Sequence, residues 1–412
     1  MVTDASLASR LLAGFRALRH AGYRRLWIGS LLSNTGSFMQ MVAQGWLVYQ
    51  LTDSAFMLGL VPCCAALPIT LLTPLGGAAA DRHDRRRILL VSQSVMTAAA
   101  LILAVMIWTQ TVTIWAILAM STLTGVAVAF NNPAYQALLL ELVGRDDLPN
   151  AIALSSLAFN ASRLLGPTLA AATLTAADIG WCYFLNGLSF FAVIIALWRI
   201  RDLPAREMKA GMALLENLRD ALRFLGGQPV MRALLLLTAA YSLLCFPQMS
   251  VLPVFARDVL GIGADGLGWM VSCFGAGGVL SSLILALLSE VPWRGRLYLA
   301  SAVSLALMLV LLGLSRNPAL SLTLMTLLGA AHVQTVVNNN TMLQRLMPDD
   351  LRGRLLSLHF LAFLGLMPLG NLLAGTLAHH LGAQRSVMIT GVCFALCVVV
   401  ASLRQPKLRT LA

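Results

Sequence analysis

The chain has 412 residues, of which 58% are hydrophobic and only 11% charged, and its net charge at pH 7 is +12. Soluble domains are roughly 45–50% apolar and about 25% charged, so the composition excludes an ordinary soluble protein and predicts an all-α polytopic membrane protein. The sequence contains no GxxxxGK[ST] loop, catalytic triad, HExxH motif or zinc cluster. We therefore expect no enzymatic activity, no catalytic residue, no cofactor and no metal site.

Segments long enough to cross a bilayer recur along the whole chain, since a membrane core takes roughly 20 apolar residues per helix. Twelve spans are expected, at 26–51, 56–80, 88–108, 112–140, 150–177, 181–199, 231–259, 266–289, 297–315, 318–344, 353–380 and 385–403. An even number of spans places both termini on the same side of the membrane.

The distribution of basic residues indicates which side that is. Of the 28 basic residues that flank the spans, 25 lie on the side of the termini, and the opposite side has only Arg257, Arg316 and Arg385. Lys and Arg accumulate in cytoplasmic loops. We therefore expect both termini in the cytoplasm and the protein in the cell (inner) membrane, with its basic loops against anionic lipids rather than nucleic acid.

A polar stretch at 200–230 is the widest connection between spans and divides them into six and six. Its middle, 212–225, has the pattern of an amphipathic helix. The expected domains are a basic cytoplasmic N-terminus (1–25), a first six-helix bundle (26–199), a cytoplasmic linker (200–230), a second six-helix bundle (231–403) and a cytoplasmic tail (404–412).

Short similarities recur in the same order in the two halves. "SAFMLGL" matches "GADGLGW", so that Gly59 and Gly268 lie 209 residues apart, and Asp81 and Glu290 have the same separation. Later in each half, "LLGP" matches "MPLG". Two parallel, pseudo-symmetric six-helix repeats with a substrate site between them are typical of transporters.

Charge is concentrated in the loop between the second and third spans, "PLGGAAADRHDRRRILL". This loop resembles the signature G-x-x-x-D-R-x-G-R-R of the major facilitator superfamily, with matches at Gly77, Asp81, Arg82, Arg85 and Arg86. Asp84 replaces the second glycine of the signature. With "WLVYQLTDSAFMLGLV" before it, this departure resembles the exporter branch that holds enterobactin exporters and macrolide-efflux proteins.

The resemblance implies a major facilitator fold and a conformational gate at this loop. In the family the aspartate, here Asp81, faces the N-terminus of span 11, and the arginines face an acid of span 4, which corresponds to Glu141. Such contacts hold the cytoplasmic side closed and break when the carrier opens inward. The gating residues implied in this way are Gly77, Asp81, Arg82, Arg85, Arg86 and Glu141. The alternative is that the charges only fix the topology.

Span 5 carries a second resemblance, to the pattern G-x-x-x-G-P-x-x-G-G of superfamily exporters. The chain has Ser162, Gly166, Pro167, Ala170 and Ala171 at these positions. Small side chains allow close helix packing, and Gly166 and Pro167 are the expected packing residues. The resemblance favours export over import.

Polar residues inside spans are candidate substrate contacts. Three sets share helix faces: Ser156, Asn160 and Arg163 in span 5; Gln40 and Gln44 in span 1; Gln334 and Asn338 in span 10, with Asn339 and His332 on an adjacent face. Such amides can equally be interhelical packing contacts. His332 and His359 are either packed neutral imidazoles or proton carriers.

None of the 17 acidic residues falls at the middle of an expected span, whereas Arg163 does. Arg163 therefore bonds either to backbone carbonyls and amides or to a negative charge of the substrate. The same distribution leaves no residue that can be named as the proton carrier, so that proton coupling is implied by the resemblance only.

We therefore predict a secondary active transporter, expected as a monomer, that exports a small amphipathic compound such as a siderophore or a drug by alternating access. Its expected partners are the small-molecule substrate, protons and membrane lipids, with no nucleic acid. The alternatives are a lipid or lysophospholipid flippase of the same fold and a non-transporting membrane scaffold or receptor.

Overall fold

The computed structural model describes residues 14–200, 222–287, 293–348 and 351–411, and this part of the chain contains helices and no strand. The first six helical elements are η1 (Arg16–Arg19), α2 (Ala21–Thr52), α3 (Ala55–Arg82), α4 (Arg85–Trp108), α5 (Ile114–Ala176) and α6 (Ile179–Trp198). The later ones are α8 (Pro229–Leu244), η2 (Phe246–Val251), α9 (Leu252–Val254), η3 (Phe255–Val259), α10 (Gly263–Leu287), α11 (Arg294–Leu314), α12 (Pro318–Leu346), α13 (Arg352–Phe360), η4 (Leu361–Gly365), α14 (Met367–Leu381), α15 (Ala383–Arg404) and η5 (Pro406–Thr410).

The described helices account for twelve spans, as the sequence predicts. Ten continuous helical segments are long and apolar enough to cross a membrane within the described residues. One of these is α5, whose 63 residues would extend about 95 Å at roughly 1.5 Å per residue, which is about three bilayer cores. Gly144 has non-helical dihedral angles there (φ 72°, ψ 178°) and divides α5 into two spans. The twelfth span is α2, whose polar residues reduce its mean hydropathy.

Spans 7 and 11 are not regular α-helices. Span 7 passes from α8 through the 3₁₀ segment η2 to the π-helix η3, and it contains Pro247 and Pro253, which cannot donate backbone hydrogen bonds. Span 11 is interrupted by the π-helix η4 between α13 and α14. The Ser242 hydroxyl of α8 donates a hydrogen bond to the carbonyl of Phe363 in η4, so that a side chain satisfies a backbone group at the irregularity.

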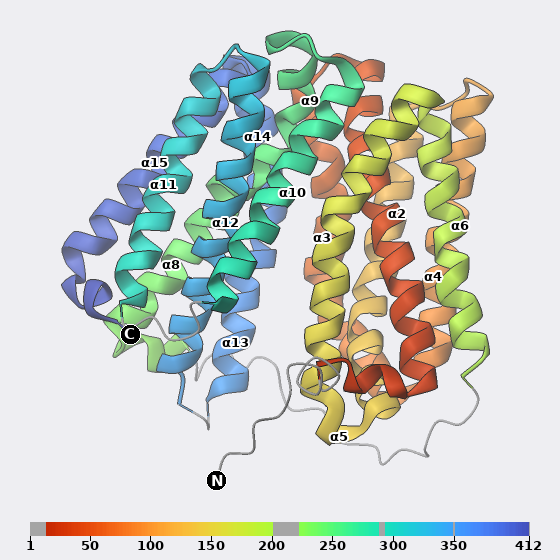
Figure 1. Cartoon of the computed structure of the whole chain (residues 1–412), viewed down its shortest axis with the longest axis horizontal. Coiled ribbons are helices and arrows are strands. Elements are labelled where there is room, and N and C mark those ends of the chain that lie inside the picture. The colour runs from red at the N-terminus through yellow and green to blue at the C-terminus, as the bar shows by residue number, and fades with distance from the viewer. Residues whose placement is uncertain (1–13, 201–221, 288–292, 349–350, 412) are drawn as a thin grey trace. The chain divides into compact units, whose positions relative to one another are not determined.

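The chain forms two compact units. The first comprises 1–41 and 71–210, and the second comprises 42–70 and 211–412, so that α2 and α3 each contribute to both. Equivalent spans pair within them: α4 lies beside α6 in the first unit, and α11 lies beside α15 in the second (Figure 1). This correspondence agrees with the two repeats seen in the sequence. The expected domain boundaries at 26, 200 and 231 stay a prediction, and 201–221 of the expected linker lie outside the described residues.

The first turns of α2 and the residues before it are hydrogen-bonded to the second part of α5. Asn150 accepts a hydrogen bond from the backbone N–H of Ala17 at 2.9 Å. The Tyr23 hydroxyl donates to the Ala151 carbonyl, and the Trp27 indole donates to the Leu154 carbonyl, both at 2.8 Å. These bonds align α2 with α5 from Gly144 onward.

Glycines set two close helix contacts. A Cβ atom at Gly59 of α3 would clash with the backbone of α14 at Asn371 and Gly375, within the second unit. A Cβ atom at Gly76 would clash with the Ala129 carbonyl of α5, within the first unit. Both ends of α3 therefore pack backbone against backbone, which only small residues permit.

Candidate functional site

The charged loop is a very tight connection, since α3 ends at Arg82 and α4 begins at Arg85. Asp84 is the N-cap of α4, and its carboxylate accepts a hydrogen bond from the Arg86 backbone N–H at 2.9 Å. Aspartate is one of the preferred N-cap residues because it satisfies a helix-end donor. The residue that departs from the superfamily signature thus has a local structural role.

Arg85 connects this loop to α5. Its guanidinium forms an ion pair with Glu141 and donates to the Ala137 carbonyl at 2.9 Å and to the Ala80 carbonyl at 3.2 Å. The side chains of Arg85 and Glu141 are only 11% and 16% exposed. Charge-assisted hydrogen bonds of this kind are stronger than neutral ones. The structure therefore brings together the arginine and the acid that the resemblance implies, within one unit.

The other loop residues are more accessible. Asp81 and Arg82 are exposed, and Arg86 donates to the Trp198 carbonyl of α6 at 3.2 Å. Gly77 borders open space, whereas Gly76 makes the close contact with α5. Arg85 and Arg86 thus tie the loop to two different helices of the first unit.

On α5, the expected substrate face is accessible. Ser156 and Asn160 are exposed and donate hydrogen bonds to carbonyls of their own helix, those of Ile152 and Ser156, at 2.9 Å each. Arg163 is partly buried and is engaged by a partner in the structure. This face therefore offers polar groups and one positive charge.

The small residues of span 5 pack on α2. Ser162 is fully buried, donates to the Leu31 carbonyl at 3.0 Å, and accepts from the Thr35 hydroxyl at 3.0 Å. A Cβ atom at Gly166 would clash with Phe38 and with the Thr35 carbonyl. The glycine-proline pattern thus lies at the α2–α5 contact.

Gln40 makes an interhelical contact. Its side-chain carbonyl accepts a hydrogen bond from the Asn186 amide of α6 at 2.6 Å, and Asn186 is only 3% exposed. This geometry is that of the packing alternative. Gln44 also interacts with another group in the structure.

Three amide side chains of α12, those of Gln334, Asn338 and Asn339, form an amide stripe inside the second unit. Asn338 is fully buried and donates to the Gln334 backbone carbonyl at 2.8 Å, and Asn339, 5% exposed, donates to the Thr238 hydroxyl of α8 at 2.5 Å. The side-chain carbonyls of Gln334, Asn338 and Asn339 are buried without a hydrogen-bond donor. The stripe therefore retains unused acceptors, which is unusual for buried amides.

His332 is packed among aromatic rings. Its Nδ1 is hydrogen-bonded to the Tyr241 hydroxyl, and its ring lies edge-on to Phe274, with 5.2 Å between centroids. His359 is partly buried, and its Nδ1 is buried without a partner. The polar centre of the second unit thus contains two imidazoles beside the amide stripe.

Sequence reasoning missed the charged cluster formed by Tyr49, Asp53, Arg257 and Asp258 in the second unit. Arg257 pairs with both aspartates, and the Tyr49 hydroxyl donates to Asp258. The sequence does contain an indication of this cluster, because Arg257 is one of the few basic residues expected opposite the termini and has an acidic residue beside it in the sequence.

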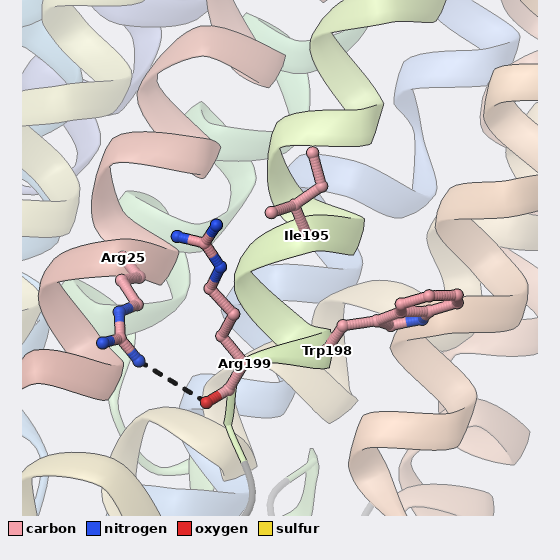
Figure 2. A pocket seen from close by; sticks show the side chains of 4 residues that line it. All are labelled: Arg25, Ile195, Trp198 and Arg199. Atoms are coloured by element: carbon pink, nitrogen blue, oxygen red, sulfur yellow. Dashed lines mark hydrogen bonds between the residues drawn. The ribbon is translucent and has the colours of Figure 1, made fainter.

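A pocket of about 530 Å³ lies between the start of α2 and the end of α6 and is lined by Arg25, Ile195, Trp198 and Arg199. Figure 2 shows the Arg25 guanidinium directed at the Arg199 backbone carbonyl, to which it donates at 3.5 Å, with Trp198 extending to the other side. The guanidiniums of Arg25 and Arg199 and the exposed Trp198 indole therefore border the same pocket.

The chain matches the family of transmembrane secretion effectors over residues 12–411. It is similar to the staphyloferrin A transporter of Staphylococcus aureus, at 26% identity over 88% of this chain and 91% of that protein. It is also similar to the multidrug efflux pump Tap of Mycolicibacterium fortuitum, at 28% identity over 93% and 95%. The enterobactin exporter EntS of Shigella flexneri is 22% identical over 82% and 80%.

Among solved structures, the fold is similar to that of a bacterial homolog of the human lysosomal transporter Spinster. The TM-score is 0.74 at 15% identity, over 95% of this chain and 98% of the other. The relatives confirm the resemblance to exporters, and the multi-pass helical fold agrees with them. The chain therefore belongs to the transmembrane secretion effector family of the major facilitator superfamily.

Proposed function

We propose that the protein is a secondary active transporter that exports a small amphipathic compound, a siderophore or a drug, across the cytoplasmic membrane by alternating access. The observation that carries this proposal is the family match over nearly the whole chain. The relatives named for siderophores and for drugs each align with more than four fifths of this chain. A lipid flippase and a non-transporting scaffold are not favoured, since those relatives are exporters, transporters and pumps.

The proposed location is the inner membrane, with both termini in the cytoplasm, because 25 of the 28 flanking basic residues lie on that side. Anionic lipid headgroups are the proposed partners of Arg25 and Arg199. The proposed state is a monomer. A C-terminal reporter that is active only outside the cytoplasm would contradict this topology.

The proposed gate is the charged loop with Glu141. The Arg85–Glu141 ion pair supports it, since a partly buried charge pair gives the loop one defined position on α5. Asp81 and Arg82 are exposed at the end of α3, in the same loop. A contact made in only one state of a transport cycle shifts the balance between states by its own free energy.

The proposed substrate contacts are the polar face of α5 (Ser156, Asn160 and Arg163), Gln40 and Gln44 of α2, and the amide stripe of α12 (Gln334, Asn338 and Asn339). The exposure of Ser156 and Asn160 and the unused carbonyls of the stripe support this assignment. Export is coupled to proton entry in this proposal.

Transport by purified protein in liposomes tests the proposal. Staphyloferrin A, enterobactin and erythromycin are offered on one side, with and without an inward-directed proton gradient, and protein-free liposomes are the control. We expect gradient-dependent movement of at least one compound, abolished by a protonophore. Movement of fluorescent phospholipids alone would indicate a flippase, and no flux of any compound would indicate a scaffold.

A further inference from the structure

A pocket of about 180 Å³ lies inside the second unit, between α8, α11, α12, α13 and η4. It is bordered by the discontinuous span 11, and it includes Asn339 from the amide stripe together with His359. Its lining is otherwise composed of aromatic, aliphatic, threonine and asparagine side chains. The described lining contains no carboxylate, ammonium or guanidinium group, so the pocket suits an uncharged occupant.

Aromatic side chains form much of its wall. The rings of Tyr241 and Phe363 are almost parallel, with an interplanar angle of 4° and 6.0 Å between centroids, and Tyr298 and Phe360 add further ring surface. Aromatic rings pack well against other flat rings in offset-stacked and edge-on arrangements. The volume is close to that of an apolar cavity of roughly 150 Å³ that holds one benzene molecule. The pocket thus has room for one substituted six-membered ring.

Two buried polar atoms at this pocket lack a hydrogen-bond partner. Asn339 is 5% exposed and uses its amide N–H on Thr238, but its side-chain carbonyl accepts no hydrogen bond. Nδ1 of His359 is also buried and unpartnered. Buried acceptors are nearly always satisfied in folded proteins. An occupant that carries a hydroxyl or N–H group would supply the missing donor.

We propose that this pocket is a subsite for one uncharged aromatic ring that bears a hydroxyl or N–H donor, and that the ring is part of the transported compound. The assignment of this ring to the transported compound rests on the proposed export function. The Asn339 carbonyl accepts the hydrogen bond of the ring substituent, and the aromatic side chains of the lining, among them Phe360 and Phe363, pack against the ring.

The test uses two probes that differ by a single hydroxyl group, 4-fluorophenol and fluorobenzene, with the purified full-length protein in nanodiscs and fluorine NMR as the readout. We expect 4-fluorophenol to bind more tightly than fluorobenzene. Asn339→Leu keeps the volume and removes the acceptor, so it should weaken binding of 4-fluorophenol about fivefold, the effect of one lost hydrogen bond, and leave fluorobenzene unchanged.

Matched variants keep the test decisive if Asn339→Leu does not fold. Thr238→Val removes the hydroxyl that accepts the Asn339 amide hydrogen bond and orients this side chain. It should therefore weaken the binding of 4-fluorophenol but not that of fluorobenzene. Thr390→Val is its control, because Thr390 is equally buried in the same unit and also donates to its own helix, but lies outside the pocket. Val336→Phe fills the pocket and should abolish binding of both probes.

Equal affinity of the two probes for the wild type, or equal losses in Thr238→Val and Thr390→Val, would overturn the subsite. The binding assay is independent of transport. A protein that moves siderophores or drugs but does not bind 4-fluorophenol would contradict the subsite alone. A protein that binds the probe as expected but moves no compound would contradict the proposed function alone.

Discussion

The Tyr49 hydroxyl donates a hydrogen bond to the Asp258 carboxylate, and the two residues are 209 residues apart. This separation is the offset of the internal repeat, which also relates Gly59 to Gly268. Equivalent positions at the ends of spans 1 and 7 thus contact each other. The guanidinium of Arg257 lies 3.9 Å from the centroid of the Tyr49 ring and pairs with Asp53 as well, so the four side chains form one connected group.

Removing the Tyr49 hydroxyl tests this contact. Tyr49→Phe keeps the ring beneath Arg257 and removes the hydrogen bond to a charged acceptor. We expect it to lower the free energy of unfolding in detergent by about 1.5 kcal/mol. Tyr135→Phe is the matched control, because the Tyr135 hydroxyl only accepts a long bond from Ser30, at 3.4 Å. If both variants lose the same amount, the contact with Asp258 contributes nothing specific.

Substitutions at Asp84 test its role as the N-cap of α4. Asp84→Ala removes the N-cap of α4 and should reduce stability by about 1 kcal/mol, whereas Asp84→Gly restores the superfamily signature and should cost only a few tenths of that. Amide hydrogen exchange in the first turn of α4 measures the local effect directly. A glycine variant as destabilised as the alanine variant would refute the capping role.

Charge removal at Arg85 should impair transport. Arg85→Gln leaves the partly buried Glu141 carboxylate without its ion-pair partner, and we expect the transport rate to fall about tenfold or more. Arg87→Gln is the control, because the Arg87 side chain is 86% exposed and lies 3.7 Å from Asp84.

The double variant Arg85→Gln/Glu141→Gln should recover part of the rate, since no unpaired charge remains. A rate that is unchanged in Arg85→Gln, or equally reduced in Arg87→Gln, would exclude a specific role for the ion pair in gating.

The positive charge of Arg163 should strengthen the binding of acidic substrates. Arg163→Gln should weaken binding of an acidic siderophore more than that of a neutral macrolide, because a guanidinium attracts a carboxylate or catecholate. Arg163→Lys should rescue only in part, since it keeps the charge and loses the planar fork. Equal losses for acidic and neutral compounds in correctly folded protein would assign Arg163 to helix packing.

The pocket in Figure 2 predicts a preference for anionic lipids. Native mass spectrometry should show more phosphatidylglycerol than phosphatidylcholine bound to the wild type. Arg25→Gln/Arg199→Gln should reduce the excess, at about 1 kcal/mol for each arginine. Arg24→Gln is the control, since Arg24 is exposed on the same helix but does not line the pocket. A loss of the same size in Arg24→Gln would indicate general surface charge.

The number of spans could be predicted because apolar segments of bilayer length and the polar breaks between them are local features of the sequence. The irregular helical geometry of spans 7 and 11 could not be predicted. The π-helices η3 and η4 depend on distant groups that satisfy the displaced backbone, such as Ser242 for the Phe363 carbonyl. A sequence pattern indicates a proline or a glycine but does not show which neighbouring helix supplies the missing hydrogen bond.

The same limit applies to the candidate site. Residue spacing predicts which polar side chains share a helix face, but their neighbours on other helices follow from packing. Gln40 and Asn186 are 146 positions apart, and neither residue type indicates the other as its partner. The pocket beside Asn339 likewise depends on Tyr241 and Phe363, whose roles as walls become visible only when spans 7 and 11 are placed together.

The close approach of Gly59 to Gly375 has a practical consequence for capturing single conformers. Because a methyl group at either position would clash with the opposing backbone, Gly59→Ala is incompatible with every arrangement in which α3 and α14 touch in this way. The substitution adds one carbon and changes no charge or polar group, and Gly59 is outside the pocket lining. Gly59→Ala should therefore enrich the arrangements in which these helices are apart, while the residues that line the pocket stay unchanged.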